Sequence, residues 1–258
     1  MTSSFGTLYL VPNTLDFGMD GTLPGLEQTL APAVIRLASR LNHWVVENAK
    51  SARAFLNRVD AIASLDRPLQ ELSIVELPRP AKGKNRAETV DLLALLAPAL
   101  AGHDLGLLSE AGLPAVADPG AAFVQLAHTQ RVRVIALPGP SSLLLALAAS
   151  GLNGQGFGFV GYLPIEPASR AARIRELEQL SRHDGHTRIM IETPYRNQAI
   201  LDALVLHLHP TTQVCVSCGL TLSSEWTRTA PIADWRAAPM TVPANVPAVF
   251  LLLAAPRA

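Results

Sequence analysis

The residues best suited to chemistry in this sequence lie in two turns. The first, SEAGLPAVADPG, contains the carboxylates Glu110 and Asp118, and the second, LPGPSS, ends in Ser141 and Ser142. An apolar helix is expected directly after the serines, and the free N–H groups at the start of a helix suit a ligand carboxylate. Glu110 is a candidate base or hydroxyl ligand, although a loop carboxylate with backbone partners is an equally good interpretation. We find no serine or cysteine triad, so these turns predict ligand binding rather than a covalent nucleophile.

Two further motifs have a structural interpretation that we prefer. Asp118-Pro119-Gly120 is typical of a helix start, so we interpret Asp118 first as an N-cap and only second as a ligand contact. Cys215 and Cys218, the two cysteines of the chain, are spaced as in some redox and zinc motifs. They lie in a strand-like run, where residues three apart point to opposite faces, and a zinc site needs two more ligands. We therefore predict two inert, half-buried thiols and no metal site.

The elements around the two turns predict a parallel sheet. Short apolar runs at Leu105–Leu108 and Val132–Leu137 precede the turns and are typical of buried strands. Apolar helices are expected after the turns, over Ala121–Thr129 and Leu143–Ser150. In such α/β sheets, ligands bind outside the carboxyl ends of the strands. The second helix is apolar on all sides, which predicts burial on every side.

The sequence pattern changes after Gly151, which predicts two domains. Residues 1–140 are expected to form an α/β domain with a mostly parallel sheet, including one helix over Leu26–Leu41. The glycine-rich stretch NGQGFGFVG does not open a helix after a strand, so we interpret it as the entry to the second domain rather than a dinucleotide site. Residues 141–258 are expected to form a second α/β domain with a mixed sheet, because helical segments give way to trailing strands.

Composition limits the classes of function. Hydrophobic residues make up 49% of the 258 residues and the net charge is zero, so the chain is globular and lacks the overall basic charge of a dedicated nucleic-acid binder. The loop 79–88 is locally basic; it could hold phosphates, but a solvated loop is the interpretation that we prefer slightly. No apolar run approaches the roughly 18–20 residues that span a bilayer, and no secretory signal is evident. We expect a cytoplasmic protein.

The motifs also carry a resemblance to a known family. SEAGLPAVADPG followed by LPGPSS resembles the tetrapyrrole methylase-type (class III) S-adenosylmethionine-dependent methyltransferases, nearest the branch that contains the bacterial 16S rRNA ribose 2′-O-methyltransferase. LYLVPNTLDF, VENAKSARAFL, GFVGYLP, IETPYRN and PAVFLLLA continue the match in the expected order along nearly the whole chain. That branch has a further small C-terminal module, which we expect to be lacking here.

The resemblance implies a site for S-adenosyl-L-methionine in a cleft between two α/β domains. Glu110 is the candidate catalytic residue. The residues that match the cofactor-binding positions of the family are Pro12, Gly112, Leu113, Val116, Ser141, Ser142, Glu192, Leu220 and Ala248. Glu47, Asn48, Lys50 and Arg53 match a segment near the substrate, although a solvated first helical turn explains them equally well.

The resemblance also implies a homodimer, but it does not fix the methyl acceptor. An RNA ribose, a tetrapyrrole and another small molecule all remain open. A catalytically silent relative that binds a ligand and serves as a regulatory or interaction module is the alternative function.

Overall fold

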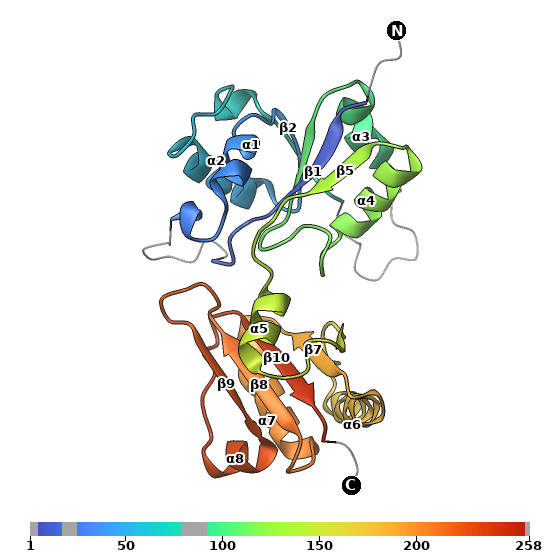
Figure 1. Cartoon of the computed structure of the whole chain (residues 1–258), viewed down its shortest axis with the longest axis vertical. Coiled ribbons are helices and arrows are strands. Elements are labelled where there is room, and N and C mark those ends of the chain that lie inside the picture. Colours follow the sequence, from blue (N-terminus) through green and yellow to red (C-terminus); the bar gives the residue numbers. More distant parts are fainter. Residues whose placement is uncertain (1–4, 17–24, 79–91, 256–258) are drawn as a thin grey trace. The chain divides into compact units, whose positions relative to one another are not determined.

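A computed structural model describes residues 5–16, 25–78 and 92–255. The chain divides into two compact units, Met1–Ser141 and Ser142–Ala258, one residue from the boundary expected from the sequence. Both units combine helices with a five-stranded sheet (Figure 1), which confirms the predicted fold class of two α/β domains. The predicted basic loop at 79–88 lies outside the described residues.

The sheet of the first unit is entirely parallel. Its order is β3-β2-β4-β1-β5, and every neighbouring pair runs in the same direction. The strands are β1 (Thr7–Val11), β2 (His43–Val46), β3 (Ser73–Glu76), β4 (Leu105–Leu108) and β5 (Arg133–Ala136). All four residues of β4 are buried, as expected for a central strand that is covered on both faces.

Two hydrophobic clusters cover this sheet. One includes residues of α1 and α2, and the other includes residues of α3 and α4. These helices are α1 (Pro32–Ala38), α2 (Ala49–Asp60), α3 (Leu92–Leu100) and α4 (Gly120–Thr129), and two short 3₁₀ helices are η1 (Leu26–Gln28) and η2 (Leu69–Glu71).

The predicted single helix over Leu26–Leu41 is wrong. The segment is divided into η1 and α1 because Ala31 precedes a proline and is extended, with φ −62° and ψ 142°. Pro32 then occupies the first turn of α1, where its missing N–H costs no helical hydrogen bond.

The sheet of the second unit is mixed, as predicted. Its order is β6-β7-β10-β8-β9, with β6 parallel to β7 and the other pairs antiparallel. The strands are β6 (Phe157–Phe159), β7 (Thr187–Ile191), β8 (Gln213–Cys218), β9 (Trp226–Pro231) and β10 (Ala248–Leu253). The stretch NGQGFGFVG lies inside the unit, after α5 (Ser142–Ser150), and contains β6, so the interpretation of this stretch as the entry to the second domain is wrong. A strand of three residues is too short to give a clear sequence signal.

The helices of this unit are α5 (Ser142–Ser150), α6 (Pro167–Asp184), η3 (Pro194–Arg196), α7 (Asn197–His207) and α8 (Ile232–Ala237). Leu144 and Leu145 of α5 are 51% and 38% exposed, so one chain alone does not bury this helix on every side. Among the described residues, no helix is both long and apolar enough to cross a membrane.

The two cysteines are free and more deeply buried than predicted. Cys218 packs in the main core of the unit with Met190 and Phe250, whereas Cys215 lies beside the Ser217 hydroxyl, 3.8 Å away. Burial raises the pKa of both thiols, which keeps them in the unreactive neutral form.

Candidate functional site

Three loops meet at the carboxyl edge of the parallel sheet in the first unit. They follow β1, β4 and β5, which are neighbours in the sheet. Asn13 and Gly112 join the first two loops through a pair of backbone hydrogen bonds of 2.9 and 3.2 Å. Gly139 brings the third loop against the first, because a Cβ added there would lie 2.2 Å from Pro12 Cβ. Close contacts therefore hold the three loops together at the edge of the sheet where ligands are expected.

The Asn13 side chain strengthens the contact between the first two loops. Its amide nitrogen donates to the carbonyls of Ser109 (3.1 Å) and Glu110 (2.9 Å), and its amide oxygen accepts from Thr14 N (2.9 Å). Asn13 is 5% exposed, so these bonds are largely protected from water. The sequence placed Asn13 in a loop without indicating this role, since its partners lie 96 and 97 residues away.

Gly112 occupies a conformation that favours glycine. Its φ is +70°, and an added Cβ would lie 3.3 Å from Leu15 Cδ2 and 3.4 Å from the Pro140 carbonyl oxygen. The backbone conformation at position 112 and its close neighbours within the protein therefore explain why this residue is a glycine.

Asp118 caps the start of α4, as the sequence predicts, because its carboxylate accepts from Gly120 N (2.7 Å) at the first residue of the helix. The assigned boundary puts Pro119, whose backbone is already helical, directly before Gly120. Both Asp118 oxygens also accept from Ala115 N (3.0 and 2.9 Å), a second role that the sequence did not reveal. It thereby holds Ala115, a non-glycine residue with a φ of 65°, and ties the loop to the helix start. Burial raises the pKa of Asp118, the two N–H donors oppose that change, and the charge of Glu47 adds to it.

The predicted residues of the first unit lie in or beside these loops. Glu110 is half-buried, and its N–H donates to Glu47 Oε2 (3.0 Å). Leu113 is half-buried, Val116 is 46% exposed and Ser141 is buried. Pro12 and Gly112 are close to Gly139 and Pro140 of the third loop, so the structure brings together members of all three loops.

The segment that follows β2 is partly structural. Asn48 caps α2 by accepting from Lys50 N (2.9 Å) and Ser51 N (3.2 Å), and Arg53 donates to the Ala49 carbonyl of its own helix. Glu47 is the member of this segment that contacts the central loop. An ion pair of 2.9 Å between Asp16 and Arg58, which the sequence did not reveal, fastens the first loop to α2.

The remaining predicted residues lie in the second unit. The register pairs Val249 with Ile191 and Ala248 with Cys218, so the end of β7, the end of β8 and the start of β10 share one edge. Glu192 and Leu220 follow the first two of these strands, and Ala248 begins the third. Ser142 is the first residue of α5.

A buried ion pair dominates this second edge. Glu192 Oε2 lies 3.2 Å from Arg196 Nη2 without hydrogen-bond geometry, and the two side chains are 2% and 15% exposed. Glu192 Oε1 accepts from Thr193 N at 2.9 Å. Asn197 donates to the carbonyls of Pro243 and Val246, whereas its fully buried Oδ1 has no hydrogen-bond partner among the described residues. This edge therefore offers polar groups that a ligand could complete.

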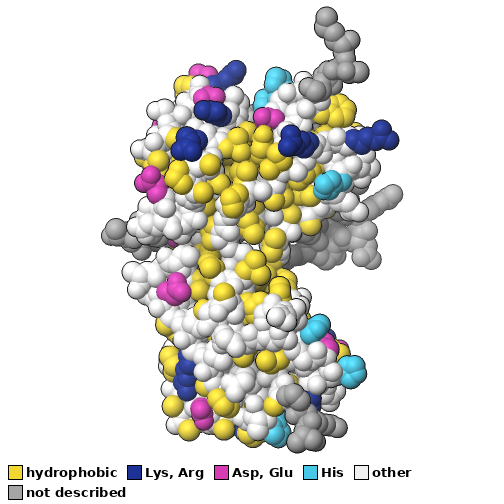
Figure 2. Space-filling view, viewed as in Figure 1, with side chains coloured by type: hydrophobic (Ala, Val, Ile, Leu, Met, Phe, Trp, Pro, Cys, Tyr) yellow, Lys and Arg dark blue, Asp and Glu magenta, His cyan; other side chains and the backbone are white. Residues whose placement is uncertain are grey.

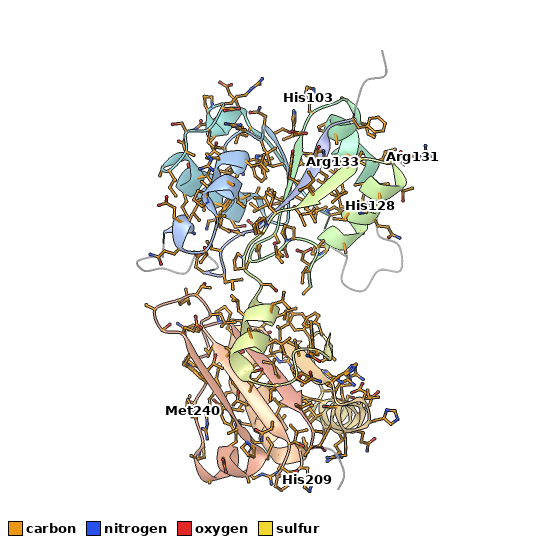
Figure 3. The ribbon with its side chains drawn as sticks, in the orientation of Figure 1. His103, His128, Arg131, Arg133, His209 and Met240 are labelled. Atoms are coloured by element: carbon orange, nitrogen blue, oxygen red, sulfur yellow. The ribbon has the colours of Figure 1, made fainter. Side chains whose placement is uncertain are left out.

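The amino ends of the strands in the first unit have a different chemistry. His103 precedes β4, Arg131 and Arg133 lie at the start of β5, and all three are labelled in Figure 3. Burial lowers the pKa of His43, and the charges of His103 and Arg67 lower it further. Within the described ranges, no three His, Cys, Asp or Glu side chains gather into a group that could hold a metal ion.

The family model for tetrapyrrole (corrin/porphyrin) methylases matches residues 29–235, which is more than half of the chain. Two solved structures share the fold: a uroporphyrin-III-C-methyltransferase from Thermus thermophilus (TM-score 0.52, 17% identity, 96% of this chain and 92% of that one) and the methyltransferase CobJ (TM-score 0.57, 18% identity, 97% and 95%).

Curated relatives carry the name ribosomal RNA small subunit methyltransferase I. The protein of Xylella fastidiosa is 39% identical over 97 residues, which is 38% of this chain and 34% of that protein. The protein of Halalkalibacterium halodurans is 29% identical over 203 residues, covering 79% and 61%. The chain spans about half the length of the curated relatives that it matches.

These findings confirm the predicted family. The chain belongs to the tetrapyrrole (corrin/porphyrin) methylase family, a family of S-adenosylmethionine-dependent methyltransferases.

Proposed function

We propose that this protein transfers a methyl group from S-adenosylmethionine to a ribose hydroxyl of RNA. The observation that carries the proposal is the similarity to relatives named for ribosomal RNA, and the Asn13–Gly112 bridge supports a ligand site by fixing two loops at the carboxyl edge of the parallel sheet. The relatives named for ribosomal RNA are 29–39% identical to this chain. The two solved methyltransferase structures are only 17–18% identical to it, so their similarity shows the fold alone. We therefore favour RNA over a tetrapyrrole as the acceptor.

The residues present fit the cofactor. Gly112 and Gly139 leave the loops without side chains where the backbones meet, and Ser142 begins a helix whose N–H groups suit a carboxylate. The buried carboxylate of Glu192 and the unpaired Asn197 Oδ1 are polar groups at the edge of the second sheet. When bound, S-adenosylmethionine supplies a methyl group on a sulfonium. The predicted cleft between the domains stays a prediction. So do the predicted binding roles of all nine residues: Pro12, Gly112, Leu113, Val116, Ser141, Ser142, Glu192, Leu220 and Ala248.

The protein's contribution to methyl transfer is positioning. Holding donor and acceptor in near-attack geometry can supply much of the rate without a covalent enzyme intermediate. Glu110 would accept the proton of the ribose hydroxyl or orient that hydroxyl, and Glu47 fixes the Glu110 backbone through a hydrogen bond of 3.0 Å. Removing a general base typically reduces the rate by about 10²–10⁴-fold.

Contacts with RNA phosphates must be local, because the net charge is zero. In Figure 2, the dark-blue side chains of the described residues are scattered over the visible face rather than gathered into one patch. Arg170 and Arg175 are candidates, since neither forms an ion pair with a described carboxylate. Burial lowers the pKa of His207, and the charges of Arg175 and Arg170 lower it further. Arg175 Nη2 lies 3.3 Å from His207 Nδ1.

The test is methyl transfer from labelled S-adenosylmethionine to small-subunit ribosomal RNA, with a uroporphyrinogen-type tetrapyrrole as the competing acceptor. We expect label in RNA, at a nucleotide that becomes resistant to alkaline cleavage because its 2′ oxygen is blocked. Glu110→Gln should reduce turnover while the cofactor affinity measured by calorimetry stays within about twofold of the parent. Label in the tetrapyrrole would refute the RNA acceptor, and cofactor binding without turnover on either acceptor would support the silent-relative alternative.

We also propose a homodimer. Leu144 and Leu145 of α5 are exposed apolar groups, as are Ala148 and Ala149 of the same helix, and a second copy could cover them. Light scattering should give twice the mass of one chain at micromolar concentration, and Leu144→Ser with Leu145→Ser should shift the protein toward the monomer. A monomeric parent would contradict the proposal.

A further inference from the structure

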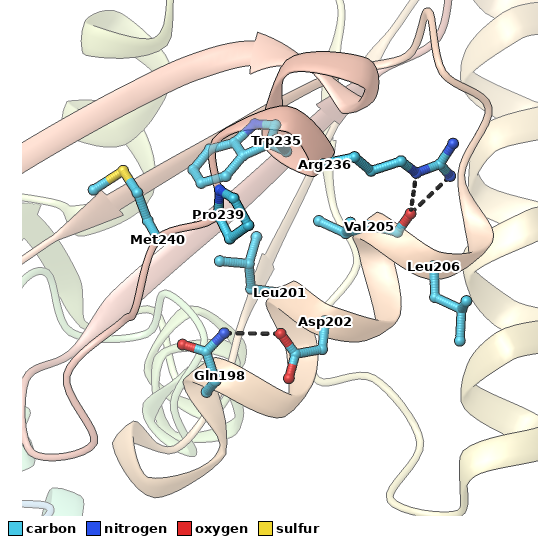
Figure 4. Close-up of a pocket in the computed structure, with 9 residues that line it drawn as sticks. All are labelled: Gln198, Leu201, Asp202, Val205, Leu206, Trp235, Arg236, Pro239 and Met240. Atoms are coloured by element: carbon cyan, nitrogen blue, oxygen red, sulfur yellow. Dashed lines mark hydrogen bonds between the residues drawn. The ribbon is translucent and has the colours of Figure 1, made fainter.

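A groove in the second unit lies apart from the edge that carries Glu192. It is formed by α7, α8 and the segment after α8, and its volume is about 600 Å³ (Figure 4). Leu201 and Trp235 are almost fully buried and form its floor. Leu206 and Met240 line it while remaining 70% and 36% exposed. The size and the apolar lining are those of small-molecule sites, which typically measure roughly 300–1,000 Å³.

The walls of the groove are fixed by hydrogen bonds within the protein. Gln198 Oε1 accepts from Val242 N at 2.8 Å, which holds the segment after α8 against α7. The Trp235 indole N–H donates to the Val214 carbonyl at 3.1 Å, and the Arg228 guanidinium lies 4.1 Å from the centre of the Trp235 ring. The groove is therefore formed before any ligand arrives, which lowers the entropic cost of binding.

The charged groups of the groove are not equivalent. Arg236 is held at the end of α7, because its Nε and Nη2 donate to the Val205 carbonyl and Nη2 also donates to the Leu208 carbonyl, although its positive charge is not neutralised by these carbonyls. Asp202 Oδ1 accepts from Gln198 Nε2 at 2.8 Å, as Figure 4 shows. Asp202 forms no ion pair with any described cation, so its other oxygen is available to a ligand. The groove thus presents an accepting carboxylate beside an apolar floor.

We propose that the α7–α8 groove binds amphiphilic cations, in which an apolar chain or ring carries a primary ammonium group. The apolar part fills the space over Leu201 and Trp235, and the ammonium group meets Asp202. This site is independent of the methyl-transfer function, since none of its lining residues belongs to the loops or the edge described above.

The test uses three probes of one shape on the full chain: 4-phenylbutylamine, 4-phenylbutan-1-ol and 4-phenylbutyrate. Titration by calorimetry and by amide NMR shifts should rank the amine first and the carboxylate last. An exposed ion pair contributes up to about 1 kcal/mol, so we expect the amine to bind about threefold to fivefold more tightly than the alcohol. Asp202→Asn should remove this preference.

Two variants and one ligand control the test. Asp234→Asn changes a carboxylate of α8 that does not line the groove and should leave all three affinities unchanged. Met240→Ser removes an apolar wall and should weaken all three probes together. S-adenosylmethionine affinity should be the same in every variant, so failure here is distinct from failure of the proposed function. No saturable binding of the amine, or a preference for it that survives Asp202→Asn, would overturn the proposal.

Discussion

The two strand edges that carry the predicted cofactor residues are stabilised by different means. In the first unit, the loops after β1 and β4 are joined by backbone hydrogen bonds and by the Asn13 amide, and glycines allow the loops to approach. In the second unit, the edge is held by the charged pair Glu192–Arg196 and by Asn197. The first edge is sensitive to shape, because a methyl group in the wrong place moves a loop. The second is sensitive to charge, because a buried ion is costly without its partner.

The largest expected effect tests the charged edge. Arg196→Met keeps much of the side-chain volume but leaves the 2%-exposed Glu192 side chain without its cation. Removing one partner of a buried pair costs about 3 kcal/mol of unfolding free energy, which urea denaturation measures. Adding Glu192→Gln to Arg196→Met should recover part of the loss. If the single variant is as stable as the parent, the ion pair does not hold this edge.

The second prediction tests the shape-sensitive edge. In Gly139→Ala, the new Cβ would lie 2.2 Å from Pro12 Cβ and 2.4 Å from Pro12 Cγ, so the loop must move. We expect a loss of about 2 kcal/mol of stability and roughly a 100-fold loss of methyl transfer, since small displacements in a site have effects of that size.

Gly154→Ala is the matched control for Gly139→Ala, because an added Cβ at Gly154 has no neighbour within 4 Å. It should leave the melting temperature and the methyl-transfer rate unchanged. Equal effects of the two substitutions would show that the contact between the first and third loops does not shape the site.

The same contrast explains what the sequence could reveal. The strands at Leu105–Leu108 and near Val132–Leu137 were predictable because apolar runs and turn residues are local signals. The hydrogen bonds from Asn13 to the central loop were not, since they join residues 96 and 97 positions apart. The role of Asp118 was predicted only in part. Its local sequence indicates a cap, and the carboxylate accepts from Gly120 N, but the bond from Ala115 N depends on the positive φ of Ala115, which the sequence does not indicate.

The third prediction separates conformation from packing at Gly112. Gly112→Ala should cost about 1 kcal/mol, because its φ of +70° is unfavourable for alanine. Gly112→Asn should cost less in backbone strain, since asparagine tolerates this region better. Chemical denaturation of both variants gives the comparison. If asparagine is no better than alanine, contact with Leu15 and Pro140, rather than φ, makes glycine necessary.

The smallest expected effect concerns pH and asks whether burial or hydrogen bonding decides the charge of Asp118 at the first edge. Burial raises the pKa of Asp118 in the folded protein, so the folded state holds this proton more tightly than the unfolded state. The resulting stability is fully present below the usual aspartate pKa of about 3.9 and is lost as pH rises through the raised pKa. Asp118→Asn removes the titrating group at similar volume. The unfolding free energy of the parent, minus that of Asp118→Asn, should therefore fall as pH rises from about 4 to 7. A difference that grows over this range would mean that the N–H groups of Gly120 and Ala115 outweigh burial. The carboxylate would then stabilise the central loop through its charge, in addition to the Asp16–Arg58 ion pair that fastens the first loop.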